Sequence, residues 1–316
     1  MDGVIGEPAV RPVAAAASLS PAIHVVGLTK RYGSTVALAG LNMTVPRGEV
    51  FGFLGPNGAG KTTAVRLLLG LARASAGEGM VLGFPLGSLE GRRRIGYLPE
   101  LFRYQGWLRA GEVLQLHCEL AGIERSSRPK EIYAVLGMVG LTGRAHDRVE
   151  TFSKGMQQRL GLAVALLGNP ELVVLDEPTS ALDPVGRHDV REVLRALKRR
   201  GVAVFLNSHL LSEVEQICDR VAVVNHGRVV AEGTLPELLA GPRVRIRCTE
   251  LEPEAMAGLT RFGAAQLVDG WLTVPGLDQA RVPALVAAIV AAGGQIHSVD
   301  PGQQTLEERF LELVEG

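Results

Sequence analysis

The sequence predicts an α/β protein whose core is a parallel sheet with helices between its strands. A short apolar strand at residues 49–54 runs into a glycine-rich turn and then into a helix that ends at Gly70. Two further apolar strands, at 171–175 and 202–206, are separated by a helical pattern that begins at Pro184. Strands that alternate with helices in this way are typical of parallel α/β sheets.

The overall composition limits the classes of protein to which this chain can belong. A length of 316 residues predicts about two domains. The 33 basic and 33 acidic residues cancel, and we therefore expect no nucleic-acid partner, which would require a basic excess. Three widely separated cysteines indicate neither a disulfide framework nor a metal site and favour a reducing compartment. They are Cys118, Cys218 and Cys248.

The chain offers no apolar run close to the roughly 18–20 residues that a membrane-spanning helix needs. The longest candidate, residues 284–292, ends at Gly293 and suits a buried helix. Residues 1–22 lack the basic and continuous apolar regions of a signal peptide, which predicts a flexible tail. We expect a soluble, cytoplasmic chain whose membrane role requires a partner.

An antiparallel β layer is predicted before the glycine-rich turn. Short alternating segments between turns indicate its strands, at 23–26, 30–33, 35–38 and 42–45. Tyr32 lies in a polar turn of this layer, where a purine ring could stack on it. Packing of the aromatic ring at a strand edge is the alternative interpretation.

The glycine-rich turn fits the pattern G-x-x-x-x-G-K-[ST], with the strand and helix flanks that this phosphate-binding motif requires. Backbone N–H groups and the helix N-terminus would surround phosphate oxygens. Lys61 would reach the β- and γ-phosphates, and the Thr62 hydroxyl would ligate Mg²⁺. The motif consists of Gly55, Pro56, Asn57, Gly58, Ala59, Gly60, Lys61, Thr62 and Thr63.

A strand at 92–100 and then a helical insert from Leu101 to about Gly143 are predicted next. Two apolar helix faces are expected in the insert, formed by Val113, Leu114, Leu116 and Leu120 and by Ile132, Val135, Leu136 and Val139. Ser153 is then a good N-cap for a helix through about Leu167. The free N–H groups of its first turn form a possible anion site, although most such caps bind nothing.

Polar residues follow two of the buried strands at the edge where parallel α/β sheets bind ligands. Asp176 and Glu177 end the strand at 171–175, where Asp176 would hold Mg²⁺ and Glu177 could polarise an attacking water. His209 follows the strand at 202–206 and is either structural or catalytic.

A hairpin of 221–224 and 229–232 is predicted to close the sheet. The remaining chain predicts a small βαββαβ domain. Its expected elements are strands at 243–247 and 295–299, a hairpin at 265–274, and helices at 253–261, 280–292 and 306–314. No chemistry is visible in this part, which would serve dimer contact, regulation or stabilisation.

In their order, these motifs resemble the ATP-binding subunits of ABC transporters over about residues 23–235. More narrowly, the chain is similar to the branch in which a separate ATPase polypeptide serves an ABC-2 type exporter. The matching motifs are Walker A at Gly55–Thr63, the signature at Ser153–Gln157, Walker B at Leu172–Glu177, the D-loop at Ser180–Asp183 and the switch at His209.

The resemblance implies a P-loop NTPase fold with an ABC ATPase core at 23–240. That core would contain an antiparallel β subdomain and a helical subdomain at about 101–165. A small α+β accessory domain would follow at 241–316.

The resemblance also implies the roles of the site residues. Two subunits, expected as a homodimer, would close around two Mg²⁺–ATP, each held between one subunit's Walker A motif and the other's signature. Catalytic roles would belong to Lys61, Glu177 and His209. Nucleotide contacts beyond Walker A would come from Tyr32, Glu100, Ser153, Gly155 and Asp183, and metal contacts from Thr62, Asp176 and Glu100.

Two positions depart from the family pattern. Glu100 replaces the usual Gln of the Q-loop, where its carboxylate can still ligate Mg²⁺ but adds negative charge beside the phosphates. The signature keeps Ser153 and Gly155, but Lys154 could add a cation near the phosphate and Met156 replaces the usual Gln.

The resemblance implies that ATP hydrolysis powers a separate integral-membrane permease at the cytoplasmic face of the membrane, with export as the direction. The alternative is a soluble ABC ATPase of translation or DNA maintenance. Such proteins carry a second cassette or a very long coiled coil. This chain has one cassette and no heptad run, which favours transport. An intact Lys61, Asp176, Glu177 and His209 argue against a regulator that no longer hydrolyses ATP.

Overall fold

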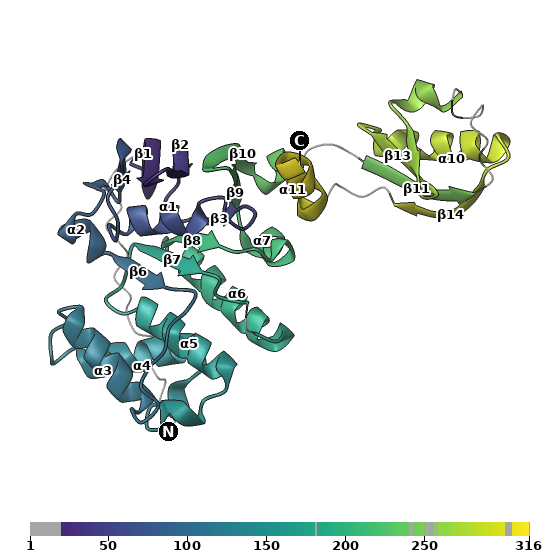
Figure 1. Cartoon of the computed structure of the whole chain (residues 1–316). Helices are drawn as coiled ribbons and strands as arrows, with labels where there is room; N and C mark the ends of the chain where they lie inside the picture. The colour runs from purple at the N-terminus through teal and green to yellow at the C-terminus, as the bar shows by residue number, and fades with distance from the viewer. Residues whose placement is uncertain are drawn as a thin grey trace. The chain divides into compact units, whose positions relative to one another are not determined.

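The computed structural model describes residues 20–180, 182–239, 243–249, 251, 256, 258–300 and 305–315 (Figure 1). The chain divides into two compact units. The first takes Met1–Leu210 with Gln216–Val230, and the second takes Leu211–Glu215 with Ala231–Gly316. The predicted tail at 1–22 lies outside the described residues up to residue 19.

A six-stranded sheet forms the centre of the first unit. Its order is β10-β9-β3-β8-β7-β6, and the pairs from β9 through β6 are parallel. The strands are β3 Val50–Leu54, β6 Ile95–Leu98, β7 Leu172–Asp176, β8 Ala203–Asn207, β9 Arg220–Asn225 and β10 Arg228–Thr234. All residues of β3, β7 and β8 are buried, because helices cover a parallel sheet on both faces. The predicted strands are therefore confirmed to within a few residues.

Four helices follow strands of this part of the chain in the sequence, and α6 begins at Pro184 as predicted. They are α1 Lys61–Leu68, α2 Leu89–Arg92, α6 Pro184–Arg199 and α7 Leu211–Ile217. Asp183 caps α6 by accepting a 2.8 Å hydrogen bond from the Gly186 N–H, and Pro184 fits the first helical position. One stripe of α6 is buried, formed by Val190, Val193, Leu194 and Leu197.

The predicted antiparallel layer exists, but its strands are longer than expected. It has the order β2-β1-β4-β5, with β1 Ile23–Tyr32, β2 Thr35–Val45, β4 Ala76–Val81 and β5 Phe84–Pro85. The four short strands predicted at 23–45 are wrong, because each long strand continues through a shift in register. Gly27 and Gly40, both at positive φ, lie at these irregularities, so the glycines mark bulges rather than turns.

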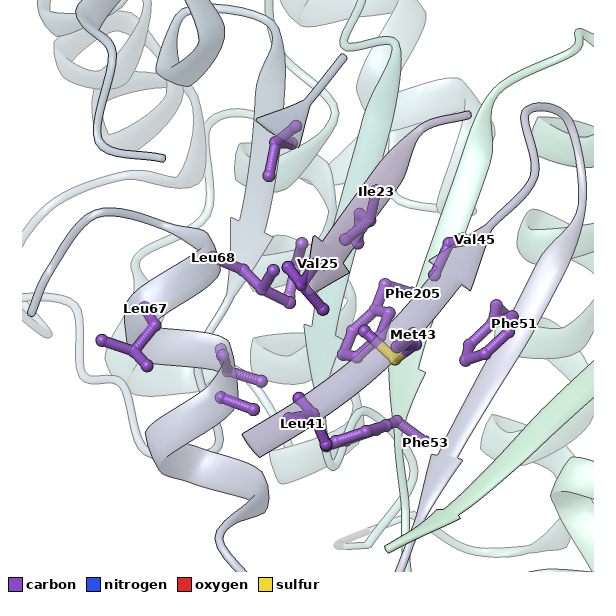
Figure 2. Close-up of a cluster of buried hydrophobic side chains, with 14 of the residues drawn as sticks. Ile23, Val25, Leu41, Met43, Val45, Phe51, Phe53, Leu67, Leu68 and Phe205 are labelled. Carbon is purple, nitrogen blue, oxygen red and sulfur yellow. The ribbon is translucent and has the colours of Figure 1, made fainter. Parts of the chain in front are cut away.

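The core of the first unit joins this layer to the parallel sheet (Figure 2). The ring of Phe53 on β3 packs against that of Phe205 on β8, with the ring centroids 5.1 Å apart and the ring planes tilted by 39°. The same cluster includes the inner face of β1 and β2 and the buried side of α1, with Ile23, Val25, Leu41, Met43, Val45, Leu67 and Leu68 labelled in the figure. This packing fixes α1, and with it the loop that precedes α1.

Three helices form the insert between β6 and β7. They are α3 Ala110–Leu120, α4 Arg128–Met138 and α5 Lys154–Ala165, with 3₁₀ turns at Thr142–Arg144 and Val149–Thr151. The predicted face of α3 is partly wrong, because Leu116 and Leu120 are exposed while Cys118 is buried with Val113 and Leu114. Leu116 and Leu120 are rotated from that stripe, since α3 buries positions near i, i+3, i+4 and i+8 counted from Ala110. Val135, Leu136 and Val139 are buried as predicted.

The second unit contains a four-stranded sheet whose strands and α10 follow the predicted order. Its elements are α8 Leu235–Leu238, β11 Arg243–Thr249, β12 Gln266–Val268, β13 Trp271–Pro275, α10 Val282–Ala291, β14 Gln295–Asp300 and α11 Leu306–Glu315, with 3₁₀ turns at Thr260–Phe262 and Gln279–Arg281. The antiparallel order β12-β13-β11-β14 places the first and last strands side by side. The helix predicted at 253–261 falls partly outside the described residues.

Side chains of β11 and β13 alternate between an apolar cluster and the open face of this sheet. The cluster is completed by Leu285 and Ile289 of α10, so one sheet face is covered by helix. Among the described helices of both units, none has the length and apolar character needed to cross a bilayer.

Candidate functional site

The glycine-rich loop is held between β3 and α1 by close backbone contacts. A Cβ at Gly55 would lie 2.3 Å from the Val224 carbonyl oxygen, and one at Gly60 would lie 2.3 Å from the Ala37 carbonyl oxygen. Gly60 also has a φ of 100°. Both positions therefore require glycine, and the loop backbone follows a path that a larger residue would block.

Lys61 folds back across this loop. Its Nζ donates hydrogen bonds to the carbonyl oxygens of Gly55 at 2.7 Å and Pro56 at 3.2 Å. Burial lowers the pKa of the Lys61 amine, and the negative charges of Glu177, Asp176 and Glu100 act in the opposite direction. The amine is thus a partly desolvated cation between the loop and the acidic residues, and Thr62 and Thr63 follow it in the first turn of α1.

Asp176 and Glu177 end β7 at the same sheet edge, and both are buried. Burial raises the pKa of each carboxyl group, because a low-dielectric surrounding disfavours the charged form. Glu177 has a φ of 54°, in the left-handed region that non-glycine residues rarely adopt. Such strain collects at functional sites, where the surrounding structure holds the residue in place.

His209 lies beside Glu177. Its Nδ1 is 2.8 Å from Glu177 Oε2, and hydrogen bonding to His209 lowers the pKa of Glu177 against the larger effect of burial. The structure therefore brings together the loop, the two acids and the histidine that the sequence predicted at one sheet edge.

Asn207 is the residue of this site to which the sequence interpretation gave no role. It is 2% exposed, and its Nδ2 donates a 2.5 Å hydrogen bond to Asp176 Oδ1. Its main-chain carbonyl accepts a 2.9 Å hydrogen bond from the Glu177 N–H. A polar residue that ends an apolar strand beside Asp176 was the available signal, since the sheet pairs Asn207 with Asp176.

Glu100 lies close enough to influence the site. It follows β6 after Pro99 and is exposed. Its charge raises the pKa values of both Asp176 and Lys61, as a nearby carboxylate must. The carboxylate at the usual Gln position thus adds to the negative charge opposite the phosphate loop.

The predicted signature residues at the start of α5 approach the predicted D-loop before α6. Ser153 caps α5 by accepting a 3.2 Å hydrogen bond from the Met156 N–H. A Cβ on Gly155 would lie 3.6 Å from Leu182, the residue before the α6 cap Asp183. Lys154 is exposed in the first turn of α5.

Tyr32 ends β1 and is 47% exposed. The Lys30 amine lies 4.8 Å from the centroid of its ring, a cation–π contact. A half-exposed ring at the end of a strand is compatible both with stacking on a purine and with packing at a strand edge.

The residues present fit a magnesium-bound nucleoside triphosphate. The loop has a backbone path that only glycines permit, with a cation at its end. The Asn207 Oδ1 atom is buried and has no hydrogen-bond partner within the described part of the chain. Carboxylate and hydroxyl oxygens from Asp176 and Thr62 are the donors that Mg²⁺ prefers.

The raised pKa of Asp176 predicts a pH-dependent gain in stability for Asp176→Asn without nucleotide. A raised folded-state pKa contributes stability that is present at low pH and lost as pH rises through it. We expect the variant to be more stable than the wild type at pH 7, on the order of 1 kcal/mol. The difference in free energy of unfolding between the variant and the wild type should shrink as the pH falls toward 3.8, the ordinary pKa of Asp.

Urea unfolding in EDTA from pH 5 to pH 8 measures this difference. Asp189→Asn is the matched control. Asp189 forms an ion pair with Arg159, with 3.4 Å between Arg159 Nη1 and Asp189 Oδ2, and is not one of the site residues. A variant that is less stable than the wild type at pH 7 would contradict the expected burial effect.

Comparison with known proteins gives one consistent result. A family model described as ABC transporter matches residues 38–180. An uncharacterized ABC transporter ATP-binding protein of Synechocystis sp. is 40% identical over 280 residues, which cover 87% of this chain and 77% of the relative. The bacitracin transport ATP-binding protein BcrA of Bacillus licheniformis is 42% identical, over 68% of this chain and 70% of BcrA. The Nod factor export ATP-binding protein I of Rhizobium sp. is 38% identical, over 76% of this chain and 80% of the relative.

Solved structures agree with these relatives. The structure of an ATP-binding subunit of an ABC transporter is 30% identical, with a TM-score of 0.63 over 68% of this chain and 91% of that one. A dimeric ATP-binding cassette in a post-hydrolysis state, bound to ADP and phosphate, is 26% identical, with a TM-score of 0.61 over 67% of this chain and 98% of that one.

Proposed function

Because this chain belongs to the family of ABC transporter ATP-binding proteins, we propose that it hydrolyses ATP as a dimer and thereby drives export through a separate membrane permease. The observation that carries the proposal is the convergence of Lys61, Asp176, Glu177 and His209 at one sheet edge. Domain limits at 23–240 for the ATPase core and 241–316 for the accessory part belong to the same proposal.

The side chains divide the work of hydrolysis. Bound Mg²⁺ neutralises phosphate charge, and Thr62 and Asp176 would hold it, with Glu100 nearby. When nucleotide binds, the Lys61 amine would donate its hydrogen bonds to phosphate oxygens instead of to the carbonyl oxygens of Gly55 and Pro56. Glu177 would accept a proton from the attacking water, and the pKa that burial raises makes its carboxylate a stronger base. His209 would keep the Glu177 carboxylate oriented through their 2.8 Å contact.

A second copy would complete the site. Gly155 lies near Leu182, the residue before Asp183, while Ser153 and Asp183 each cap a helix of their own chain. The related cassette solved with ADP and phosphate is a dimer, which supports this arrangement for the present chain. Lys154 would then bring a cation from the second copy to the phosphates, and Tyr32 would stack on the adenine.

Transport is favoured over a role in translation or DNA maintenance by the names of the relatives. One is named for bacitracin transport and another for Nod factor export. Both names favour an exporter, whose permease would hold this chain at the cytoplasmic face of the membrane.

A candidate permease-docking segment precedes α3. Phe102 and Tyr104 anchor it, with ring centroids 5.4 Å apart and Tyr104 also 5.8 Å from His117. Leu101, just before these anchors, is 87% exposed, and Trp107, just after them, is 69% exposed. A fixed segment that presents two large apolar side chains to solvent is typical of an interaction site.

Replacing Leu101 and Trp107 together by Glu should therefore remove the permease from the purified complex. We expect the wild-type chain to co-purify with a polytopic membrane protein from detergent extracts of its native cells. The double variant should bind ATP normally yet lose at least about 90% of that partner, since two anchors of this kind each contribute about 1–2 kcal/mol or more.

Val268→Glu is the control, because Val268 is an exposed apolar residue in the second unit. Undiminished capture by the double variant would reject this docking segment. Recovery of the wild-type chain only with ribosomes or DNA would reject the transport function itself.

A further inference from the structure

Asn207 contacts both acidic residues of the site through two of its atoms, and a third polar atom is left unpaired. Its Nδ2 bonds to Asp176 Oδ1, its carbonyl oxygen accepts the Glu177 N–H, and its Oδ1 is buried without a partner in the described structure. Strand β8 lies between β3 and β7, which pairs Asn207 with Phe53 on one side and Asp176 on the other. Asn207 thus lies on the strand between β3, which leads into the phosphate loop, and β7, which leads to Asp176 and Glu177.

The orientation of the amide follows from its neighbour. An ionised carboxylate only accepts hydrogen bonds, so the amide nitrogen must face Asp176 and the amide oxygen must face away from it. A buried amide oxygen without a partner is costly, and native proteins rarely leave one unless another group completes the bond. The Asn207 amide oxygen is therefore an acceptor that the described residues leave unused.

Metal ligands are commonly fixed by a second layer of hydrogen bonds. Such partners orient the ligating oxygen, and their loss lowers metal affinity or activity about 10–100-fold. Asn207 has this relation to Asp176, since it engages one carboxylate oxygen and leaves the other for the site.

We propose that Asn207 is a positioning residue for the magnesium site, which holds Asp176 in its ligating orientation and offers its Oδ1 to a water in the shell of the metal. The proposal rests on the proposed ATPase function. It adds to that function a residue on β8 that governs metal affinity rather than nucleotide affinity.

The test separates metal binding from nucleotide binding. The full-length wild type, Asn207→Ala and Asn207→Leu are titrated with the ATP analogue AMP-PNP in EDTA, and then with Mn²⁺ at saturating AMP-PNP while the free Mn²⁺ signal is followed by EPR. We expect both variants to bind AMP-PNP in EDTA like the wild type. Their affinity for Mn²⁺ should fall about 10–100-fold.

Asn207→Leu matters because it fills the buried volume while it removes the side-chain hydrogen bond to Asp176. A residue needed only for packing would tolerate Leu, so unchanged Mn²⁺ affinity in a folded Leu variant would overturn the proposal. Ser208→Ala is the control, since Ser208 is also buried but accepts its hydrogen bond from the Leu210 N–H. We expect it to bind Mn²⁺ as the wild type does.

The ATPase function and the role of Asn207 can be rejected separately. If the wild type does not bind AMP-PNP, both the ATPase function and the role of Asn207 are wrong. If the wild type binds AMP-PNP and Mn²⁺ and the Leu variant does so equally well, only the role of Asn207 is wrong.

Discussion

Glu177→Gln should lower the rate of ATP hydrolysis by about 10²–10⁴-fold while ATP still binds. The amide preserves the shape of the side chain and its left-handed backbone but cannot accept the proton of the attacking water. Because hydrolysis reopens the proposed dimer, the variant should accumulate as an ATP-bound dimer. Phosphate release measures the rate, and size-exclusion chromatography with Mg²⁺–ATP measures the dimer.

Glu78→Gln is a suitable comparison, since Glu78 is an exposed carboxylate on β4. Its turnover should equal that of the wild type. A Glu177→Gln protein that hydrolyses ATP at close to the wild-type rate would remove Glu177 as the catalytic base. Loss of ATP binding in the same variant would instead indicate a role in holding the nucleotide.

Lys61→Ala should weaken ATP binding by about 100-fold or more. The amine makes two hydrogen bonds across the loop, and in the proposed complex both would pass to phosphate oxygens. Hydrogen bonds to charged groups contribute about 1.5–3 kcal/mol each, so the loss of two is large. Removal of the only positive charge that the loop itself carries also leaves Asp176 and Glu177 to repel the phosphates.

Equilibrium titration with a fluorescent ATP analogue measures this affinity. Lys130→Ala is the matched control, because Lys130 is exposed on α4 and far along the chain from the loop. Wild-type ATP affinity in Lys61→Ala would contradict the assignment of the phosphate loop.

The phosphate loop, the buried strands and the caps were predictable because each depends on neighbours in the sequence. Ser153 and Asp183 cap their helices with hydrogen bonds that span three residues. Gly55 and Gly60 were recognised from the motif, although the atoms that require glycine belong to Val224 and Ala37. Local patterns therefore identified the loop without revealing which distant backbone atoms leave no room for a side chain there.

The wrong predictions share a dependence on distant contacts. Gly27 and Gly40 suggested turns, whereas pairing with the neighbouring strands carries β1 and β2 through both positions as bulges. Leu116 and Leu120 were expected to be buried, but the side of α3 that packs on α4 and α5 is set by the whole insert. Asn207 went unnoticed because its importance comes from Asp176, which lies on a neighbouring strand 31 positions earlier.

The antiparallel pairing of β11 with β14 has a consequence for the order in which the chain folds. Helices α8 and α11 contact each other although residues 239–305 lie between them. Closing so long a loop costs about 2 kcal/mol more in chain entropy than closing one of a few residues. Once Arg245 is paired with Asp300, however, the two ends of the sheet are neighbours and the effective loop is short. The last helix therefore joins α8 most readily after the sheet has formed, and a change that unfolds the sheet should also release α11.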